Sequence, residues 1–301
     1  MITLDFHMHL FPSAAEGRRA VADFPIVEYG EHDGVPFSTR AGTVADGLAA
    51  LAAAGAAHGC ILGSYELPRL PHPPDGGWPA APPYPEHAAE LRTYNEWVCE
   101  AGAAHPELLP FVTVNPAVLG AAEAAAQVAE LADERGARGL KLHTIALRAH
   151  PSEAALAPTF TVCAERRLPV VVHCGPDRHG AGWALPAAFA PVLEREPQLP
   201  LVLAHLGGAA WRQTAAFAAA FPAARFDLSE IVAWTGAPQA PTAAELVALI
   251  RAIGPERVLL GSDFPWYEPA DTVAQVGELP GLGEAEREAI LGANAAALLG
   301  L

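Results

Sequence analysis

The sequence predicts a single-domain (β/α)8 barrel of the TIM type that spans residues 1–301. Short apolar runs rich in β-branched residues alternate with longer segments rich in Ala, Leu and Glu, a pattern typical of βα units around a parallel sheet. Polar residues at the ends of these runs recur about every 31 residues in the second half of the chain, the average unit of such a barrel. The eight predicted strands cover residues 2–7, 57–63, 109–114, 138–143, 169–173, 200–205, 224–228 and 257–262.

The predicted helices lie between these strands and after the last one. Thr43, Ser152 and Thr242 are placed as N-caps, because their side-chain oxygens can accept a hydrogen bond from the first helical turn. Gly207 and Gly208 are expected to permit a tight turn into the next helix. The helical segments are 44–54, 86–104, 119–135, 152–166, 185–195, 208–221, 241–252, 284–291 and 293–300.

Two connections, 10–42 and 64–85, are about twenty residues longer than an average βα unit allows. Both follow a strand and therefore belong to the face of the barrel at which the strands end, where active sites of this fold are built. The second contains eight prolines, which exclude regular structure. We interpret both as lid or dimer-contact loops; tolerated insertion at the surface remains the alternative.

Composition and charge exclude several classes of function. The 18 Lys and Arg against 34 Asp and Glu give a net charge of −16, which leaves no basic face for nucleic acid. A chain with 51% hydrophobic residues is not disordered, and no apolar run of about 18 residues predicts a membrane span. The start has no signal-peptide pattern, so we expect a cytoplasmic protein. The four cysteines lack metal or disulfide spacing and are expected to be reduced, buried thiols: Cys60, Cys99, Cys163 and Cys174.

His7 and His9 form the first candidate metal-binding pair. They are two residues apart on the first strand, so their side chains point to the same side. Two converging neutral imidazoles suit a divalent metal; zinc is expected, and iron, manganese, cobalt and nickel remain open. The apolar residues of the strand are expected to lie under the helices, which directs both imidazoles into the barrel mouth: Ile2, Leu4, Phe6 and Met8.

Three more polar residues fall at predicted strand ends. His173 follows the fifth strand, His205 the sixth, and Asp263 the eighth. Because the ends of parallel strands meet on one rim of a barrel, we expect these side chains to converge with His7 and His9. These five strand-end residues favour a metal site over a buried polar network.

Six motifs then resemble the amidohydrolase superfamily, in its amidohydrolase-related (amidohydrolase-2) branch. They are DFHMHLFP, GLKLH, VVVHCG, LAHLGG, LLGSDFPW and ILGANAAALLGL, in order and over nearly the whole chain. The branch contains lactonases, amide hydrolases and metal-dependent decarboxylases, so the resemblance specifies the family and leaves the substrate open.

The resemblance implies that His7, His9, His173 and Asp263 ligate one divalent ion. It also implies that His205 reaches the metal-bound water and that Asp263 is both a ligand and a candidate base. The metal would lower the pKa of that water toward about 7. His205, with an ordinary pKa of about 6.5, can take or return a proton. We therefore name His205 and Asp263 as the catalytic residues.

Lys141 and three other residues are expected to contact the substrate. In some branches of the superfamily a lysine at this position is carboxylated and bridges two metals, but a mononuclear site with Lys141 and His143 at the mouth is favoured here. A pair between Lys141 and an acid such as Asp227 remains the alternative. Trp266 is expected to form an apolar wall, and Arg40 to clamp an anion, unless it is an ordinary surface charge.

These features favour a metal-dependent hydrolase that acts on an ester, lactone or amide of a small, carboxylate-bearing molecule. The alternative is a metal-dependent non-oxidative decarboxylase of the aminocarboxymuconate-semialdehyde type, since the HxH start argues against the resorcylate type. A non-catalytic metal- or ligand-binding barrel is a third possibility. We expect a homodimer, a small-molecule substrate, and neither a nucleic-acid nor a membrane partner.

Overall fold

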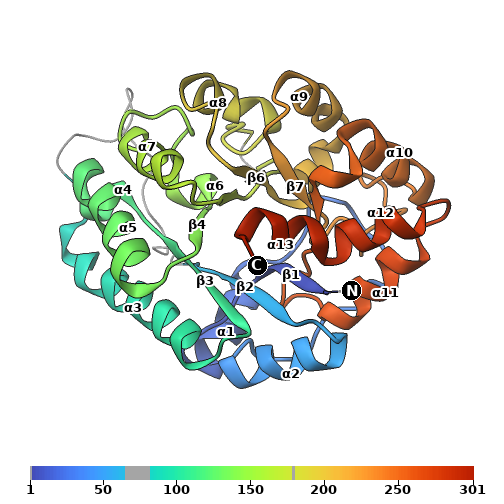
Figure 1. Ribbon diagram of the computed structural model, residues 1–301, viewed down its shortest axis with the longest axis horizontal. Coiled ribbons are helices and arrows are strands. Elements are labelled where there is room, and N and C mark those ends of the chain that lie inside the picture. Colours follow the sequence, from blue (N-terminus) through green and yellow to red (C-terminus); the bar gives the residue numbers. More distant parts are fainter. Residues whose placement is uncertain (1, 65–81, 178–179) are drawn as a thin grey trace.

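The computed structural model describes residues 2–64, 82–177 and 180–301. Within these ranges eight parallel strands pair in chain order in one sheet, as predicted, and the helices surround them (Figure 1). Each strand overlaps its predicted range. The strands are β1 (Leu4–Met8), β2 (His58–Leu62), β3 (Leu108–Thr113), β4 (Gly139–Leu142), β5 (Val170–Val172), β6 (Leu201–Leu203), β7 (Arg225–Asp227) and β8 (Val258–Leu259).

Hydrogen bonds between β1 and the segment after β8 complete the barrel. The Phe6 N–H donates to the Leu260 carbonyl, and the Asp263 N–H donates to the His7 carbonyl, both at 2.8 Å. Met8 also pairs with Phe264 in a parallel bridge. This connection places Asp263 directly beside the end of β1, which carries the two histidines.

The α-helices follow the predicted order, with additions and several late starts. They are α1 (Ala14–Asp23), α2 (Val44–Ala54), α3 (Ala88–Ala104), α4 (Pro116–Leu119), α5 (Ala121–Arg135), α6 (Thr144–Leu147), α7 (Ala157–Arg166), α8 (Ala190–Arg195), α9 (Thr214–Ala220), α10 (Ala243–Ile253), α11 (Pro269–Glu278), α12 (Glu284–Glu288) and α13 (Asn294–Leu299). Thr43 and Thr242 form capping boxes with Asp46 and Glu245, which confirms these two N-caps.

The N-cap predicted at Ser152 is wrong. Helix α7 begins at Ala157 and its N-cap is Leu156, because Pro158 lies in its first turn. A proline has no N–H to donate and clashes with the preceding turn, so the helix cannot extend back to Ser152. Helix α9 likewise starts late, at Thr214, because the chain from His205 to Gly208 has positive φ throughout. The predicted tight turn at Gly207 and Gly208 is confirmed.

The long connection 10–42 is not wholly irregular, because it contains α1. Ser13 caps this helix by accepting a hydrogen bond from the Glu16 N–H, and Glu16 accepts one from the Ser13 hydroxyl. Helix α11, which begins at Pro269, was also not predicted. Most of the second long connection, 64–85, lies outside the described residues. Its interpretation as a lid or dimer-contact loop therefore stays a prediction.

The apolar residues of β1 do not all lie under the helices, which was the expectation. Leu4 and Phe6 belong to the apolar cluster inside the barrel, whereas Met8 packs against Leu51 of α2. The pairing of β1 with β2 shifts register between Asp5 and Met8, and this irregularity breaks the alternation of the strand. His7 and His9 nevertheless face the barrel mouth, where both line the cavity.

The opposite end of the barrel is covered by the C-terminal helix. Ala295 and Leu299 of α13 pack against the interior cluster, and Figure 1 shows this helix lying across the barrel beside both chain ends. All four cysteines are free and buried, as predicted. Among the helices of the described ranges, none is both long and apolar enough to cross a membrane.

Candidate metal centre

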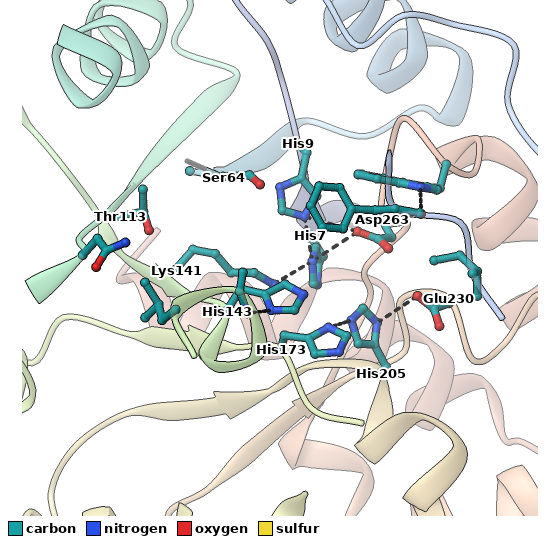
Figure 2. A pocket seen from close by; sticks show the side chains of 17 residues that line it. His7, His9, Ser64, Thr113, Lys141, His143, His173, His205, Glu230 and Asp263 are labelled. Atoms are coloured by element: carbon teal, nitrogen blue, oxygen red, sulfur yellow. Dashed lines mark hydrogen bonds and ion pairs between the residues drawn. The ribbon is translucent and has the colours of Figure 1, made fainter. Parts of the chain in front are cut away.

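The polar residues predicted at the strand ends converge on one cavity. Figure 2 shows His7, His9, His173, His205 and Asp263 around it. The cavity measures about 730 Å³, including the part open to solvent. Its position at the carboxyl ends of the strands is where this fold places active sites.

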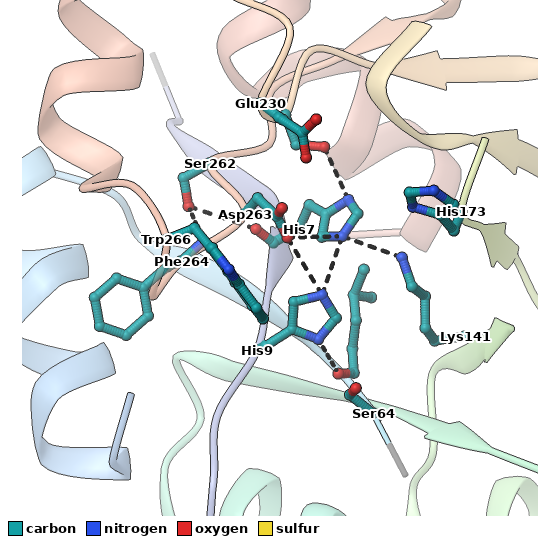
Figure 3. Close-up of polar contacts among 12 residues, drawn as sticks. His7, His9, Ser64, Lys141, His173, Glu230, Ser262, Asp263, Phe264 and Trp266 are labelled. Carbon is teal, nitrogen blue, oxygen red and sulfur yellow. Dashed lines mark hydrogen bonds and ion pairs between the residues drawn. The ribbon is translucent and has the colours of Figure 1, made fainter. Parts of the chain in front are cut away.

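His7, His9 and Asp263 form a compact triangle of possible ligand atoms (Figure 3). His7 Nε2 lies 3.2 Å from His9 Nε2, and each nitrogen lies 3.3 Å from Asp263 Oδ1. A tetrahedral zinc ion with bonds of about 2.0–2.1 Å separates its ligand atoms by roughly 3.3 Å. The three atoms therefore have the mutual spacing that a divalent ion requires, and all three residues are buried.

Hydrogen bonds at the far edges of the two rings fix which nitrogens face the triangle. His9 Nδ1 lies 2.9 Å from the Leu62 carbonyl, which can only accept, so Nδ1 carries the proton. His7 Nδ1 lies 3.0 Å from Asp227 Oδ2 and donates to it. Both Nε2 atoms then present lone pairs to each other and to the Asp263 carboxylate. Three acceptors this close fit a bound cation, so this donor set fits the metal that the motifs imply.

Asp227, at the end of β7, connects several parts of the site. Its Oδ1 accepts hydrogen bonds from the backbone N–H groups of His205 and Ser229 at 3.0 and 3.1 Å. The Ser229 hydroxyl also donates to it. Although burial opposes ionisation, the imidazole of His7 and these donors hold the pKa of Asp227 well below its usual value. Asp227 thus orients His7 as an ionised acceptor, a role that the sequence did not reveal.

His205 is held with a lone pair available at the cavity. Its Nδ1 lies 3.1 Å from the Ser229 carbonyl and therefore donates to it, which leaves Nε2 unprotonated. Its backbone has a φ of 59°, and the Asp227 contact to its N–H stabilises this turn. Burial lowers the pKa of His205, so the ring is neutral near pH 7. A neutral imidazole with an unprotonated Nε2 can accept a proton.

His173 and His143 lie against each other beside His205. Their rings stack with centroids 4.2 Å apart, and His173 Nδ1 lies 3.2 Å from His205 Nε2. Burial, and then the neighbouring imidazole of His143, lower the pKa of His173. His173 thus lies in the cavity as predicted but one ring away from the triangle, and its role as a ligand stays a prediction.

Lys141 extends from β4 to the edge of the triangle. Its Nζ lies 3.1 Å from His7 Nε2, on the edge of the ring opposite to Asp227, and the residue is only 3% exposed. Burial, followed by the charge of Lys141, lowers the pKa of His7 to about 3. His7 is therefore an uncharged donor for a metal at neutral pH.

Of the remaining residues predicted to contact substrate, Trp266 lines the cavity and Arg40 does not. The Trp266 ring lies edge-on to His9 with centroids 5.7 Å apart, and its Nε1 donates to the Phe24 carbonyl. Arg40 instead pairs with Glu268 at 3.2 Å, and its side chain is 34% exposed. The structure does not bring Arg40 to the described lining of the cavity.

Two acids that sequence reasoning missed also belong to this region. Glu230 lines the cavity, is buried, and has a carboxylate oxygen 4.0 Å from His205 Nδ1. Glu28, from the first long connection, accepts a hydrogen bond from the Ala209 N–H at 2.8 Å. Burial raises the pKa of both carboxyls, that of Glu28 to about 7. Glu230 follows the end of β7 closely, which was the one signal available for it.

Comparisons with known proteins identify the family and the fold of the chain. The chain matches the protein family described as amidohydrolase over residues 4–301. An uncharacterised TIM-barrel protein from Bordetella bronchiseptica is similar in structure, with 19% identity, a TM-score of 0.75, and coverage of 100% of this chain and 99% of that one.

Two decarboxylases are also similar in fold. The 5-carboxyvanillate decarboxylase from Sphingomonas paucimobilis has 16% identity and a TM-score of 0.67, with 100% and 99% of the two chains covered. A dihydroxybenzoic acid decarboxylase from Polaromonas, with bound manganese, has 15% identity and a TM-score of 0.67, with 100% and 97% covered. No curated protein matches the chain. The match over residues 4–301 shows that the chain belongs to the amidohydrolase family.

Proposed function

We propose that this protein is a metal-dependent hydrolase that cleaves an ester, lactone or amide bond in a small, carboxylate-bearing molecule. The observation that carries the proposal is the triangle of His7, His9 and Asp263, next to an unprotonated His205 Nε2. Family membership supports metal-dependent chemistry in the same cavity.

The residues have distinct roles in this proposal. His7, His9 and Asp263, together with His173, would hold one divalent ion, and zinc suits this donor set of imidazoles and one carboxylate. When bound, such an ion supplies Lewis acidity that polarises a carbonyl and lowers the pKa of a coordinated water. His205 Nε2 accepts the proton that the attacking water loses and returns it to the leaving group. Lys141 and His143 orient the substrate.

The proposal is tested by product analysis after zinc loading. A panel of small lactones, esters and amides, with and without a carboxylate, is compared with unsaturated and aromatic acids. We expect release of titratable acid without carbon dioxide. Carbon dioxide release without hydrolysis would replace the proposal by decarboxylation, which the fold similarity to two decarboxylases makes the second candidate.

A substitution at His205 separates catalysis from metal binding. His205→Asn is the suitable variant, because Asn tolerates the positive φ at this position better than most residues. We expect activity to fall at least about 100-fold, as for loss of a general base, while the metal content is unchanged. Unchanged activity with metal still bound would contradict the role of His205 as the base.

We also propose that the enzyme is a cytoplasmic homodimer. The support is the resemblance to the family and the length of the connections after β1 and β2. Sedimentation at micromolar concentration tests the assembly: twice the mass of 31.4 kDa is expected, and a monomer would contradict it.

A further inference from the structure

The side of the cavity near the ends of β2, β3 and β4 contains hydrogen-bond donors that the metal triangle does not use. Ser64 follows β2, Thr113 ends β3, and Asn115 lies two residues further along. Thr113 and Lys141 are paired across β3 and β4. Figure 2 shows Ser64 near His9 and Thr113 beyond Lys141, on the side of the cavity away from Glu230.

We propose that this side of the cavity is a subsite for a carboxylate of the substrate that does not react. Ser64, Thr113 and Asn115 would bind it, with Lys141 and His143 supplying further donors. The inference rests on the proposed function and deepens it, because it specifies a substrate with a carboxylate held apart from the scissile carbonyl.

Hydrogen bonds fix the backbone of Thr113 and the amide of Asn115. The side chains of the subsite also carry donors that no described residue uses. The Thr113 N–H and carbonyl both bond to the Asn95 amide, at 3.0 and 2.7 Å. The Asn115 Oδ1 accepts from the Ala117 N–H at 2.9 Å, which fixes its amide so that Nδ2 is the remaining donor. Among the described residues, neither the hydroxyls of Ser64 and Thr113 nor Asn115 Nδ2 makes a hydrogen bond. Thr113 and Asn115 are 6% and 2% exposed. These donors are therefore left for a ligand in the cavity that the three residues line.

The tautomer of His143 adds one more donor on the same side. Its Nδ1 accepts a hydrogen bond from the Ala146 N–H at 3.2 Å. Because an accepting Nδ1 is unprotonated, the ring carries its proton on Nε2. A group of N–H and O–H donors beside the ammonium of Lys141 is suited to a carboxylate. The Glu230 carboxylate lies on the other side of the cavity.

Apolar side chains also line the same cavity. Phe24, Ile26, Leu147 and Trp266 are among its lining residues. They suit the short hydrocarbon part of a molecule that has a polar group at each end. The carboxylate in the subsite is therefore retained in the product, and the ligand class is a small ester, lactone or amide with a distal carboxylate.

Binding of unreactive acids tests the subsite without depending on catalysis. The zinc-loaded protein is titrated by calorimetry with dicarboxylates from malonate to adipate and with monocarboxylates of equal length. We expect at least one dicarboxylate to bind about tenfold more tightly than its monocarboxylate partner, the effect of one additional charge-assisted hydrogen bond. Equal affinity within every pair would overturn the proposal.

Two variants and one control locate the effect. Asn115→Asp keeps the oxygen that caps α4 but replaces the Nδ2 donor by a repelling oxygen, and Thr113→Val removes only the hydroxyl. Both are expected to weaken the dicarboxylate about tenfold and the monocarboxylate less than about threefold, with zinc content unchanged. Thr159→Val is the control, because the Thr159 hydroxyl is buried without a partner and lies outside the cavity lining. Equal weakening of both acids by the two variants would contradict the subsite.

The binding experiment and the hydrolysis assay can contradict the subsite and the proposed function independently of each other. A dicarboxylate preference that both variants abolish, in a protein without hydrolase activity, supports the subsite and contradicts the proposed function. Hydrolysis of neutral lactones in a protein without a dicarboxylate preference supports the proposed function and contradicts the subsite.

Discussion

Asp227 Oδ2 accepts a hydrogen bond from His7 Nδ1 at 3.0 Å, although β7 and β1 are far apart in the sequence and β8 lies between them in the barrel. This contact determines that the other nitrogen of His7 faces His9 and Asp263. A carboxylate behind a metal-facing imidazole fixes the tautomer and raises the basicity of the ring. The geometry of the candidate metal centre therefore depends on β7 as much as on the residues that touch the ion.

Removal of the Asp227 charge is expected to weaken metal binding without unfolding the protein. Asp227→Asn keeps an oxygen acceptor but loses the ionised partner of His7, so zinc affinity should fall about 10- to 100-fold. Competition with a chromophoric chelator measures this. Asp133→Asn is the matched control, because Asp133 pairs with Arg166 at the surface. Equal zinc affinity in wild type and Asp227→Asn would show that this carboxylate does not support the site.

The number of ions per chain is expected to be close to one. Mass spectrometry of protein purified without chelator should find this ion in the wild type and in Lys141→Met, but not in His7→Ala, since His7 supplies a corner of the triangle. Two ions in the wild type, with loss in Lys141→Met, would instead indicate a carboxylated lysine that bridges two metals.

Gly208 cannot accept a side chain while Glu28 is in place. A Cβ at Gly208 would overlap Glu28 Oε1, and the φ of 56° and ψ of −140° favour glycine. Gly208→Ala should lower the free energy of unfolding by more than the roughly 1–3 kcal/mol of backbone strain alone. In a Glu28→Ala background the same change should cost less, because the clash is absent. Equal cost in both backgrounds, measured by urea unfolding, would rule out the contact.

The stability of the protein is expected to depend on pH through Glu28. Burial raises the pKa of its carboxyl from 4.5 to about 7, so the folded chain keeps this proton to higher pH than the unfolded chain. Its contribution to stability is full below about pH 4.5 and is lost as the pH rises through about 7. Glu28→Gln keeps the acceptor for the Ala209 N–H and removes the titration.

The difference in unfolding free energy between Glu28→Gln and wild type should therefore shift in favour of the variant by up to about 3 kcal/mol from pH 5 to pH 8. Urea unfolding at a series of pH values measures it. Glu245→Gln is a surface control in the capping box of α10. A difference that is the same at pH 5 and pH 8 would show that Glu28 does not titrate in this range.

Local patterns were sufficient for most elements and insufficient for some. Thr43 and Thr242 are predictable as N-caps because an N-cap depends on neighbouring residues. Ser13, with Glu16 three residues later, is a local signature of the start of α1. Pro158 was the signal that α7 begins late. The register shift in β1 had no signal of this kind, because it is set by the pairing of that strand with β2.

The sequence by itself determined the βα order, the strand ends, and the placement of His7, His9, His173, His205 and Asp263 on one rim. These follow from the period of the apolar runs, because parallel strands of a barrel must end on the same side. Only the tertiary structure decided which nitrogen of each imidazole faces the cavity, that Asp227 supports His7, and that Arg40 pairs with Glu268 outside it. Tautomers and ion pairs depend on atoms brought together from distant strands, and the separation of residues along the chain does not encode those distances.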